Sequence, residues 1–308
     1  MKLSLVVPCY NEAENVLPFH QAANTVFSGC GFDYEIIYVD DGSKDATLHN
    51  LKKIYNMGQT PVKVVSFSRN FGKEAALYAG LAQTCGDYIC FIDADLQQRP
   101  ETVLKMVQIL DSKPECDVVA AYQDRRNEGK VLSFFKKNFY KLINRLSDID
   151  LKSDASDFRT FRRSVAESIL NLGEYHRFSK GIFAWVGFET CYVPYVACER
   201  VAGNSKWSFF KLFNYAVEGI IGYSTKPLRI ATFLGGFTAF MAMLYLVIVV
   251  LQKLIAGIDI PGYATIIVLI LFLGGMQLFC IGIIGEYIGK IFEQSKDRPI
   301  YIAKEILK

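Results

Sequence analysis

Two long stretches without a charged residue constrain this chain more than any other feature of its sequence. They run from Ile230 to Gln252 and from Ile260 to Gly285. Each is longer than the roughly 20 apolar residues that an α-helix needs to cross the hydrocarbon core of a bilayer. We therefore predict two transmembrane helices, at residues 230–252 and 262–289. The alternative is a pair of helices buried in a soluble core, although such long uncharged segments are uncommon in soluble folds.

Basic residues flank the predicted spans on the sides away from their connector. They are Lys226, Arg229, Lys290, Lys296 and Arg298. Positive charges gather on the cytoplasmic side of membrane proteins, so we expect an integral membrane protein with both termini in the cytoplasm. The first apolar run is short and is interrupted by Pro8, which is unlike a signal peptide.

The residues before the spans show the pattern of an α/β domain. Short runs rich in Val and Ile alternate with segments long enough for helices, which predicts a doubly wound parallel sheet within residues 1–200. The predicted strands are Leu3 to Val7, Glu35 to Val39, Val62 to Phe67, Tyr88 to Ile92 and Val118 to Tyr122. We assign residues 201–229 to a loop and juxtamembrane amphipathic helix, and residues 290–308 to a cytosolic tail.

Cysteine spacing and net charge exclude several other classes of protein. The eight cysteines show no CxxC or Cys/His spacing, so we expect them to be reduced and free of metal. A net charge of +3 is too small to indicate nucleic-acid binding. No GxGxxG follows the first strand and no GxxxxGK[ST] occurs, which argues against a Rossmann dinucleotide enzyme and a P-loop NTPase.

Polar side chains follow four successive predicted strands, at the edge where doubly wound sheets bind ligands. These segments are Pro8 to Glu12, Asp40 to Ser43, Ser68 to Lys73 and Asp93 to Gln97. Asp93 and Asp95 leave the same side of an extended chain, and Gln97 adds a further oxygen. Mg²⁺ or Mn²⁺ prefers such oxygen ligands and retains substrate phosphates, so this row predicts a metal site for a phosphorylated substrate.

An ordered set of motifs carries a family resemblance. "VVPCYNE", "VDDGSKD", "FSRNFGKEAALYAG" and "DADLQ" are followed by "SDFRTFRRSV" from Ser156, "RVAGNSKWSF" from Arg200 and the two predicted spans. The chain resembles the family 2 glycosyltransferases, which have a GT-A nucleotide-sugar fold. Within them it is most similar to the polyisoprenyl-phosphate enzymes, the bactoprenol glucosyltransferases above all, and it is related to dolichyl-phosphate mannose synthase.

The resemblance implies a binding site for a UDP-sugar. The residues implied in nucleotide-sugar binding are Pro8, Tyr10, Glu12, Asp41, Arg69, Lys73 and Asp93. Asp93, Asp95 and Gln97 are implied in holding the metal. Arg69 and Lys73 would meet phosphates, and the alternative for these two residues is a surface turn and a helix start. Bound metal would stabilise the charge on the departing diphosphate.

The same resemblance implies catalysis at Asp157, Asp95 and Arg200. A phosphate monoester has its second pKa near 6, so a lipid phosphate acceptor is largely deprotonated at neutral pH. We therefore expect Asp157 mainly to position the nucleophile or a sugar hydroxyl. The alternative is a strand-edge carboxylate paired with an arginine, Arg159 or Arg162.

The acceptor is expected to be a polyisoprenyl phosphate such as undecaprenyl phosphate. Arg200, Ser205 and Lys206 offer the guanidinium, hydroxyl and ammonium that a phosphate needs. Aromatic residues in Trp207 to Tyr223 and an amphipathic pattern in Ser133 to Leu146 predict segments that lie on the bilayer surface. For the second segment, a helix packed on the sheet remains the alternative.

The predicted activity is inverting transfer of a hexose, most simply glucose from UDP-glucose, to the lipid phosphate for O-antigen or cell-envelope modification. GDP-mannose or an aminoarabinose nucleotide would use the same architecture. A processive polysaccharide synthase would need a QxxRW-like motif and more spans, neither of which is present. A non-catalytic membrane protein that binds nucleotide sugar or lipid would not need the carboxylates. The sequence does not predict an oligomeric state, and a homo-oligomer is one alternative.

Overall fold

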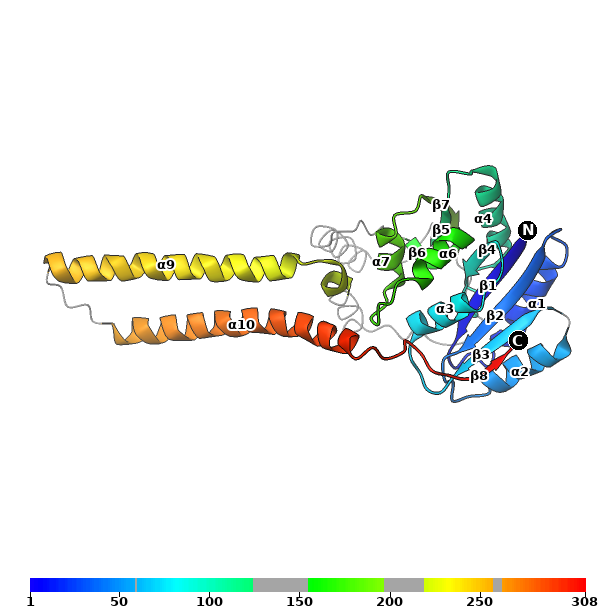
Figure 1. The fold of residues 1–308 in the computed structure, drawn as a ribbon, viewed down its shortest axis with the longest axis horizontal. Coiled ribbons are helices and arrows are strands. Elements are labelled where there is room, and N and C mark those ends of the chain that lie inside the picture. The colour runs from blue at the N-terminus through cyan, green and yellow to red at the C-terminus, as the bar shows by residue number, and fades with distance from the viewer. Residues whose placement is uncertain (59, 124–154, 197–218, 257–261) are drawn as a thin grey trace.

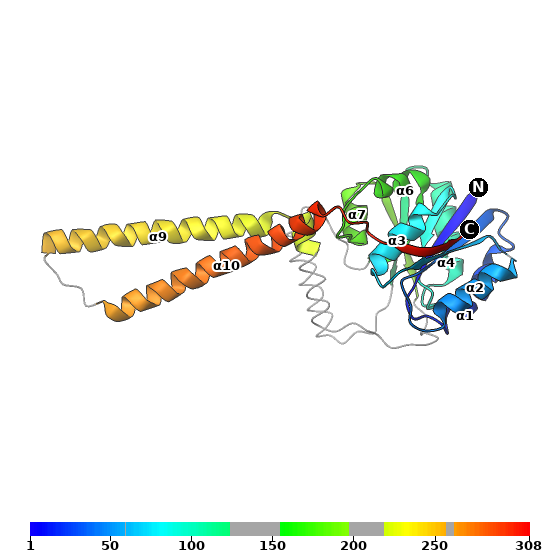
Figure 2. The same ribbon diagram turned by 60° about the horizontal axis from the view of Figure 1, so that its bottom comes forward.

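A computed structural model describes residues 1–58, 60–123, 155–196, 219–256 and 262–308 of the chain. These residues form an α/β domain from which two long helices project side by side (Figures 1 and 2). The predicted surface segment Ser133 to Leu146 lies outside the described residues, as does the first part of the segment from Trp207 to Tyr223.

The five strands predicted from the apolar runs are all present. They are β1 (Lys2–Cys9), β2 (Asp33–Asp40), β3 (Val62–Phe67), β4 (Tyr88–Phe91) and β5 (Val118–Gln123). Three further strands are β6 (Ala155–Arg162), β7 (Thr190–Tyr195) and β8 (Ala303–Leu307). They join in one sheet with the order β7-β5-β6-β4-β1-β2-β3-β8. The centre from β4 to β3 is parallel, while β6 runs antiparallel to β4 and β5, and β8 runs antiparallel to β3.

Helices cover both faces of the sheet, which confirms the doubly wound prediction. One face packs against α1 (Val16–Phe27), α2 (Thr47–Met57) and α4 (Pro100–Ser112). The other packs against α3 (Lys73–Ala82), α6 (Arg163–Leu170) and α7 (Ser179–Trp185). Because side chains alternate along a strand, Leu5 faces the first set while Val6 faces the second. Each fully buried side chain of this kind stabilises the fold by about 1.5–3 kcal/mol.

The two projecting helices, α9 (Lys226–Ala256) and α10 (Tyr263–Ser295), are long and apolar enough to cross a membrane. Large apolar side chains on them are exposed, with Phe233 at 77% and Leu271 at 69%. A pair of buried core helices is therefore excluded. With 33 residues, α10 is about 50 Å long, whereas the hydrocarbon core is about 30 Å thick. Its last turns thus extend past the predicted end at residue 289.

The extended end of α10 is attached to the α/β domain. Gln294 donates from Nε2 to the Gly173 carbonyl at 2.9 Å and accepts from the Tyr175 backbone N–H at 2.8 Å. The neighbouring residues His176 and Glu293 also pair with each other. These contacts fix the foot of the helical hairpin against the loop that precedes α7.

The last residues, which we expected to form only a tail, return to the sheet as its edge strand β8. Tyr301 stacks on Phe67 with ring centroids 5.0 Å apart, and Glu305 pairs with Lys52 at 2.6 Å. The strand crosses beside β3 after the hairpin has turned back (Figure 1). The segments before and after the hairpin therefore lie on the same side of it.

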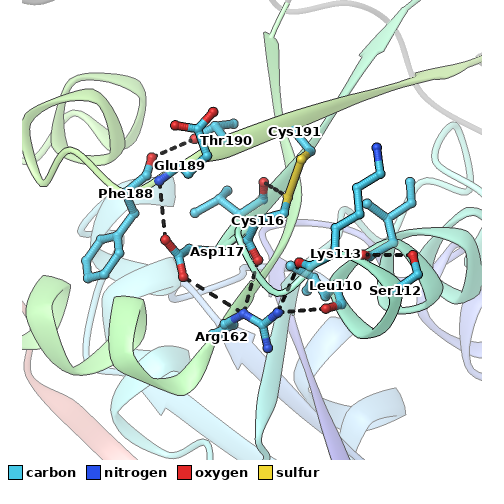
Figure 3. Close-up of a disulfide and its surroundings, with 12 residues drawn as sticks. Leu110, Ser112, Lys113, Cys116, Asp117, Arg162, Phe188, Glu189, Thr190 and Cys191 are labelled. Atoms are coloured by element: carbon cyan, nitrogen blue, oxygen red, sulfur yellow. Dashed lines mark hydrogen bonds and ion pairs between the residues drawn. A yellow bond between two sulfur atoms is a disulfide. The ribbon is translucent and has the colours of Figure 1, made fainter.

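The prediction that all cysteines are reduced was wrong for one pair. Cys116 and Cys191 are joined by a disulfide across 75 residues of sequence (Figure 3). They meet because β5 and β7 pair in parallel, with Val119 opposite Cys191. Spacing along the chain carries no sign of that pairing. Arg162 lies beside the disulfide, donates to the Cys116 carbonyl at 3.0 Å and approaches Asp117 at 3.9 Å (Figure 3).

Candidate functional site

The loops that follow β1 and β2 form one unit at the carboxyl edge of the sheet. Asn11 donates its backbone N–H to Ser43 Oγ at 3.0 Å and accepts from the Lys44 N–H at 2.9 Å. Its φ of 55° lies in the left-handed region, which Asn tolerates better than most residues. The predicted nucleotide-sugar residues Pro8, Tyr10 and Glu12 lie on or beside the first of these loops.

The loop after β2 holds the loop after β3. The buried carboxylate of Asp41 accepts from the backbone N–H groups of Phe71 at 2.6 Å and Gly72 at 3.0 Å. Gly42 has a φ of 65°, and a Cβ there would lie 2.4 Å from the carbonyl carbon of Arg69. Burial raises the pKa of Asp41 to about 6 although these hydrogen bonds lower it. Asp41 therefore shapes the loop that carries Arg69, and nucleoside contact by Asp41 remains a prediction.

Lys73 joins the loop after β3 to the loop after β4. Its Nζ lies 2.6 and 2.9 Å from the two carboxylate oxygens of Asp93, and 3.8 Å from Oδ2 of Asp157. Desolvation alone would lower the pKa of Lys73, but the two carboxylates outweigh it and raise the pKa. Lys73 is thus held as a cation between two acids that are 64 residues apart.

Asp157 reaches this position because β6 runs antiparallel beside β4. Phe91 of β4 pairs with Arg159 of β6. Asp93 and Asp157 lie two residues beyond this pair, at the same end of the two strands. Burial would raise the pKa of Asp157, but the charges of Lys73, Lys180 and Arg159 lower it. Among the described residues, its buried Oδ1 has no hydrogen-bond partner. Pairing with Arg162, one of the structural alternatives, is excluded because Arg162 faces Asp117.

The turn after β4 presents Asp93 and Asp95 beside a residue that sequence reasoning missed. This residue is Gln98, which accepts from the Asp93 N–H at 3.0 Å and donates to the Asp93 carboxylate at 3.3 Å. Asp95 accepts from the Gln97 N–H at 3.2 Å. Leu96 adopts a φ of 59°, rare for a branched residue and typical of turns shaped for function.

A cavity of about 980 Å³ extends from Lys73 and Asp157 to the end of α10 that contacts the α/β domain. Arg69, Lys73 and Asp157 line one part of it, and Tyr287 and Lys290 of α10 line another. Residues that are far apart in the sequence thus share one chamber. Arg200, Ser205 and Lys206, the residues predicted to bind an acceptor phosphate, lie outside the described residues, and their role stays a prediction.

Comparison with known sequences agrees with this architecture. The sequence profile described as Glycosyl transferase family 2 matches residues 4–170, and the profile described as the GtrB C-terminal hairpin matches residues 226–291. The chain belongs to glycosyltransferase family 2. The first match covers the strands and loops that form the site, and the second covers α9 and most of α10.

Two full-length relatives support the family assignment, and a solved structure shows the same fold. This glycosyltransferase is 41% identical over 304 residues to the bactoprenol glucosyl transferase of Shigella phage SfV, covering 99% of this chain and 98% of that protein. It is 40% identical over 308 residues to the prophage bactoprenol glucosyl transferase homolog of Escherichia coli (strain K12), covering both chains completely. Mannosyl-3-phosphoglycerate synthase from Rubrobacter xylanophilus shares the fold, with 18% identity, 71% coverage of each chain and a TM-score of 0.52.

Proposed function

We propose that this glycosyltransferase moves glucose from UDP-glucose to a polyprenyl phosphate, undecaprenyl phosphate or a close analogue, on the cytoplasmic face of a membrane. The observation that carries the proposal is the shared chamber. It brings Lys73 and Asp157 into one cavity with the end of a helix long enough to cross a bilayer. A water-soluble donor and a membrane-bound acceptor need such a common space. The names of the full-length relatives support glucose and bactoprenol as the two substrates.

The four linked loops are suited to bind the nucleotide sugar. Each loop is bonded to the next, through Ser43, Asp41 and Lys73 in turn. The binding site for the nucleotide sugar is therefore largely assembled before the sugar binds. Preorganised groups stabilise developing charge without a reorganisation cost. Lys73 supplies a fixed cation where the diphosphate is expected to accumulate negative charge as it leaves.

The oxygen-bearing side chains beside Lys73 are suited to bind Mg²⁺ or Mn²⁺. Asp93, Asp95 and Gln97 would hold the ion through two carboxylates and one amide oxygen, the ligand type that both cations prefer. These residues supply fewer oxygens than the six ligands of Mg²⁺, so a diphosphate and water would complete the coordination. Bound there, the ion would act as a Lewis acid toward the leaving diphosphate.

Asp157 is the residue best placed to orient the attacking group. One of its oxygens faces Lys73 and the other is buried without a partner among the described residues. An unpaired buried acceptor is costly, and a hydroxyl group of the bound sugar or acceptor would satisfy it. With its pKa lowered, Asp157 stays ionised at neutral pH and serves as a hydrogen-bond acceptor.

The test is transfer of labelled sugar from a panel of UDP- and GDP-sugars to undecaprenyl phosphate, with and without EDTA. We expect label in the lipid phase from UDP-glucose alone, and its loss when EDTA removes the metal. Transfer from GDP-mannose or an aminoarabinose nucleotide instead would overturn the donor assignment. Folded protein that transfers no sugar from any donor would support the non-catalytic alternative.

A further inference from the structure

Glu74 is an acidic residue close to Lys73 and Asp157, and the proposed mechanism gives Glu74 no role. It is the second residue of α3 and lines the same cavity as Asp157. Its Oε2 accepts hydrogen bonds from both the backbone N–H of Ser179, at 3.0 Å, and the Ser179 hydroxyl. Ser179 is 7% exposed and begins α7. The carboxyl group of Glu74 therefore fastens the start of α7 to the start of α3.

The start of α7 is closely packed on its other side. A Cβ on Gly181 would lie 2.5 Å from the Tyr223 ring and 2.7 Å from Phe178, so this turn has no room to move toward them. Lys180, between Ser179 and Gly181, is one of the cations whose charge acts on Asp157. A shift of α7 would change the surroundings of Asp157 without touching Asp157 itself.

We propose that Glu74 is a positioning residue for glycosyl transfer, which holds the first turn of α7, and with it Lys180, against Asp157. The inference rests on the proposed function, since it concerns the same reaction. It adds Glu74 of α3, and the helix α7, to the structural features that position the carboxylate of Asp157.

The charges around Glu74 give the proposal a readout beyond stability. Asp157 faces Glu74 from β6, and Lys73 faces it from α3 itself. Arg177 lies on the segment that enters α7, Ser179 is the first residue of α7, and Tyr223 lies on the segment before α9. Desolvation first, and then the charge of Asp157, raises the pKa of Glu74 to about 7. A neutral Glu74 keeps a second negative charge away from anionic substrates, and this advantage is lost as pH rises through 7.

Two variants separate the hydrogen bonds from the charge. Glu74→Gln keeps an oxygen for Ser179 and stays neutral at every pH, whereas Glu74→Ala removes both functions. Ser179→Ala removes one of the two hydrogen bonds and serves if Glu74→Ala fails to fold. Glu167→Gln, an exposed carboxyl on α6, is the control for loss of an acid.

The experiment measures kcat and the acceptor KM between pH 6 and 8, together with the affinity for UDP. For Glu74→Ala we expect kcat/KM for the acceptor to fall about 100-fold, as a misplaced group does, with UDP affinity unchanged. For Ser179→Ala we expect a fall of about 10-fold. For Glu74→Gln we expect activity within about threefold of wild type at pH 6, and severalfold above wild type at pH 8. Glu167→Gln should match wild type throughout.

Three results overturn the inference, and each can be told apart from the others. If wild type transfers glucose and both Glu74 variants match it at every pH, Glu74 has no role and the proposed function stands. A Gln variant as damaged as the Ala variant, with an unchanged pH profile, also refutes the positioning role. If wild type transfers no sugar at all, the proposed function fails and this inference fails with it.

Discussion

Replacing Lys73 with methionine should reduce the transfer rate strongly and the stability of the fold only slightly. The substitution keeps the length and much of the apolar stem of the side chain and removes only the charge that bridges Asp93 and Asp157. The Lys73 and Asp93 side chains are 43% and 32% exposed, so solvent screens their ion pair. Such pairs contribute about 0–1 kcal/mol. We therefore expect Lys73→Met to lower the free energy of unfolding by about 1 kcal/mol or less.

The effect on transfer should be much larger. Removing one preorganised group that stabilises transition-state charge typically costs 10²–10³-fold in kcat, or about 3–4 kcal/mol. Burial raises the pKa of Asp157, and the charge of Lys73 is one of those that lower it. Without Lys73, the pKa of Asp157 should therefore rise. The acidic limb of the pH profile should then move to higher pH.

Lys63 provides the matched control at the opposite end of the sheet. Its Nζ lies 3.1 Å from the buried carboxylate of Glu35, away from the reactive cluster. Hydrogen bonds to buried charged groups contribute about 1.5–3 kcal/mol. Lys63→Met should therefore cost about 2 kcal/mol of stability and leave kcat of the folded fraction unchanged. Urea unfolding and initial transfer rates measure both quantities. A Lys73→Met protein with kcat within threefold of wild type would refute the role given to Lys73.

Three further predictions follow from the same geometry. Asp95→Asn should abolish metal-dependent transfer while circular dichroism and membrane association stay as in wild type; normal turnover would refute the metal assignment. Gly42→Ala should weaken UDP binding at least 10-fold, because a left-handed backbone costs an alanine about 1–2 kcal/mol and the new Cβ would clash with the Arg69 backbone. Unchanged UDP affinity in a titration would show that the loop tolerates the alanine. Glu35 has its pKa lowered to about 2 because hydrogen bonds from Ser4, Cys85 and Lys63 outweigh desolvation. Its contribution, about 3 kcal/mol, is present above pH 4.5 and lost as pH falls toward 2, so Glu35→Gln should destabilise at pH 7 and have little effect near pH 2; equal destabilisation at both values would contradict the lowered pKa.

The parts of the fold that the sequence predicted are those with local signals. Apolar runs such as Leu3 to Val7 alternate with helical segments, and each becomes a strand within one or two residues of its expected ends. The uncharged stretches likewise become α9 and α10. Such patterns are readable because burial on both faces of a sheet, or exposure to lipid, acts on every residue of the element.

The missing parts depend on contacts between distant segments. β8 adds to the edge of the sheet only after the hairpin returns the chain to β3, and the disulfide forms only because β7 pairs with β5. Neither pairing leaves a periodic signal. In the site, the family resemblance assigned Lys73 to the nucleotide sugar and Asp157 to catalysis, but their proximity depends on the antiparallel direction of β6. Gln98 and Glu74 were missed because amide and acid residues at helix starts are common in any sequence.

UDP release from UDP-glucose, measured with the full-length protein in lipid nanodiscs with and without undecaprenyl phosphate, tests the central claim most directly. If the chamber joins a nucleotide-sugar site to a lipid-phosphate acceptor, UDP should appear in step with glucosylated lipid, only when the lipid is present, and not with Asp157→Asn. Equal UDP release without the lipid, or release that Asp157→Asn leaves unchanged, would contradict the account.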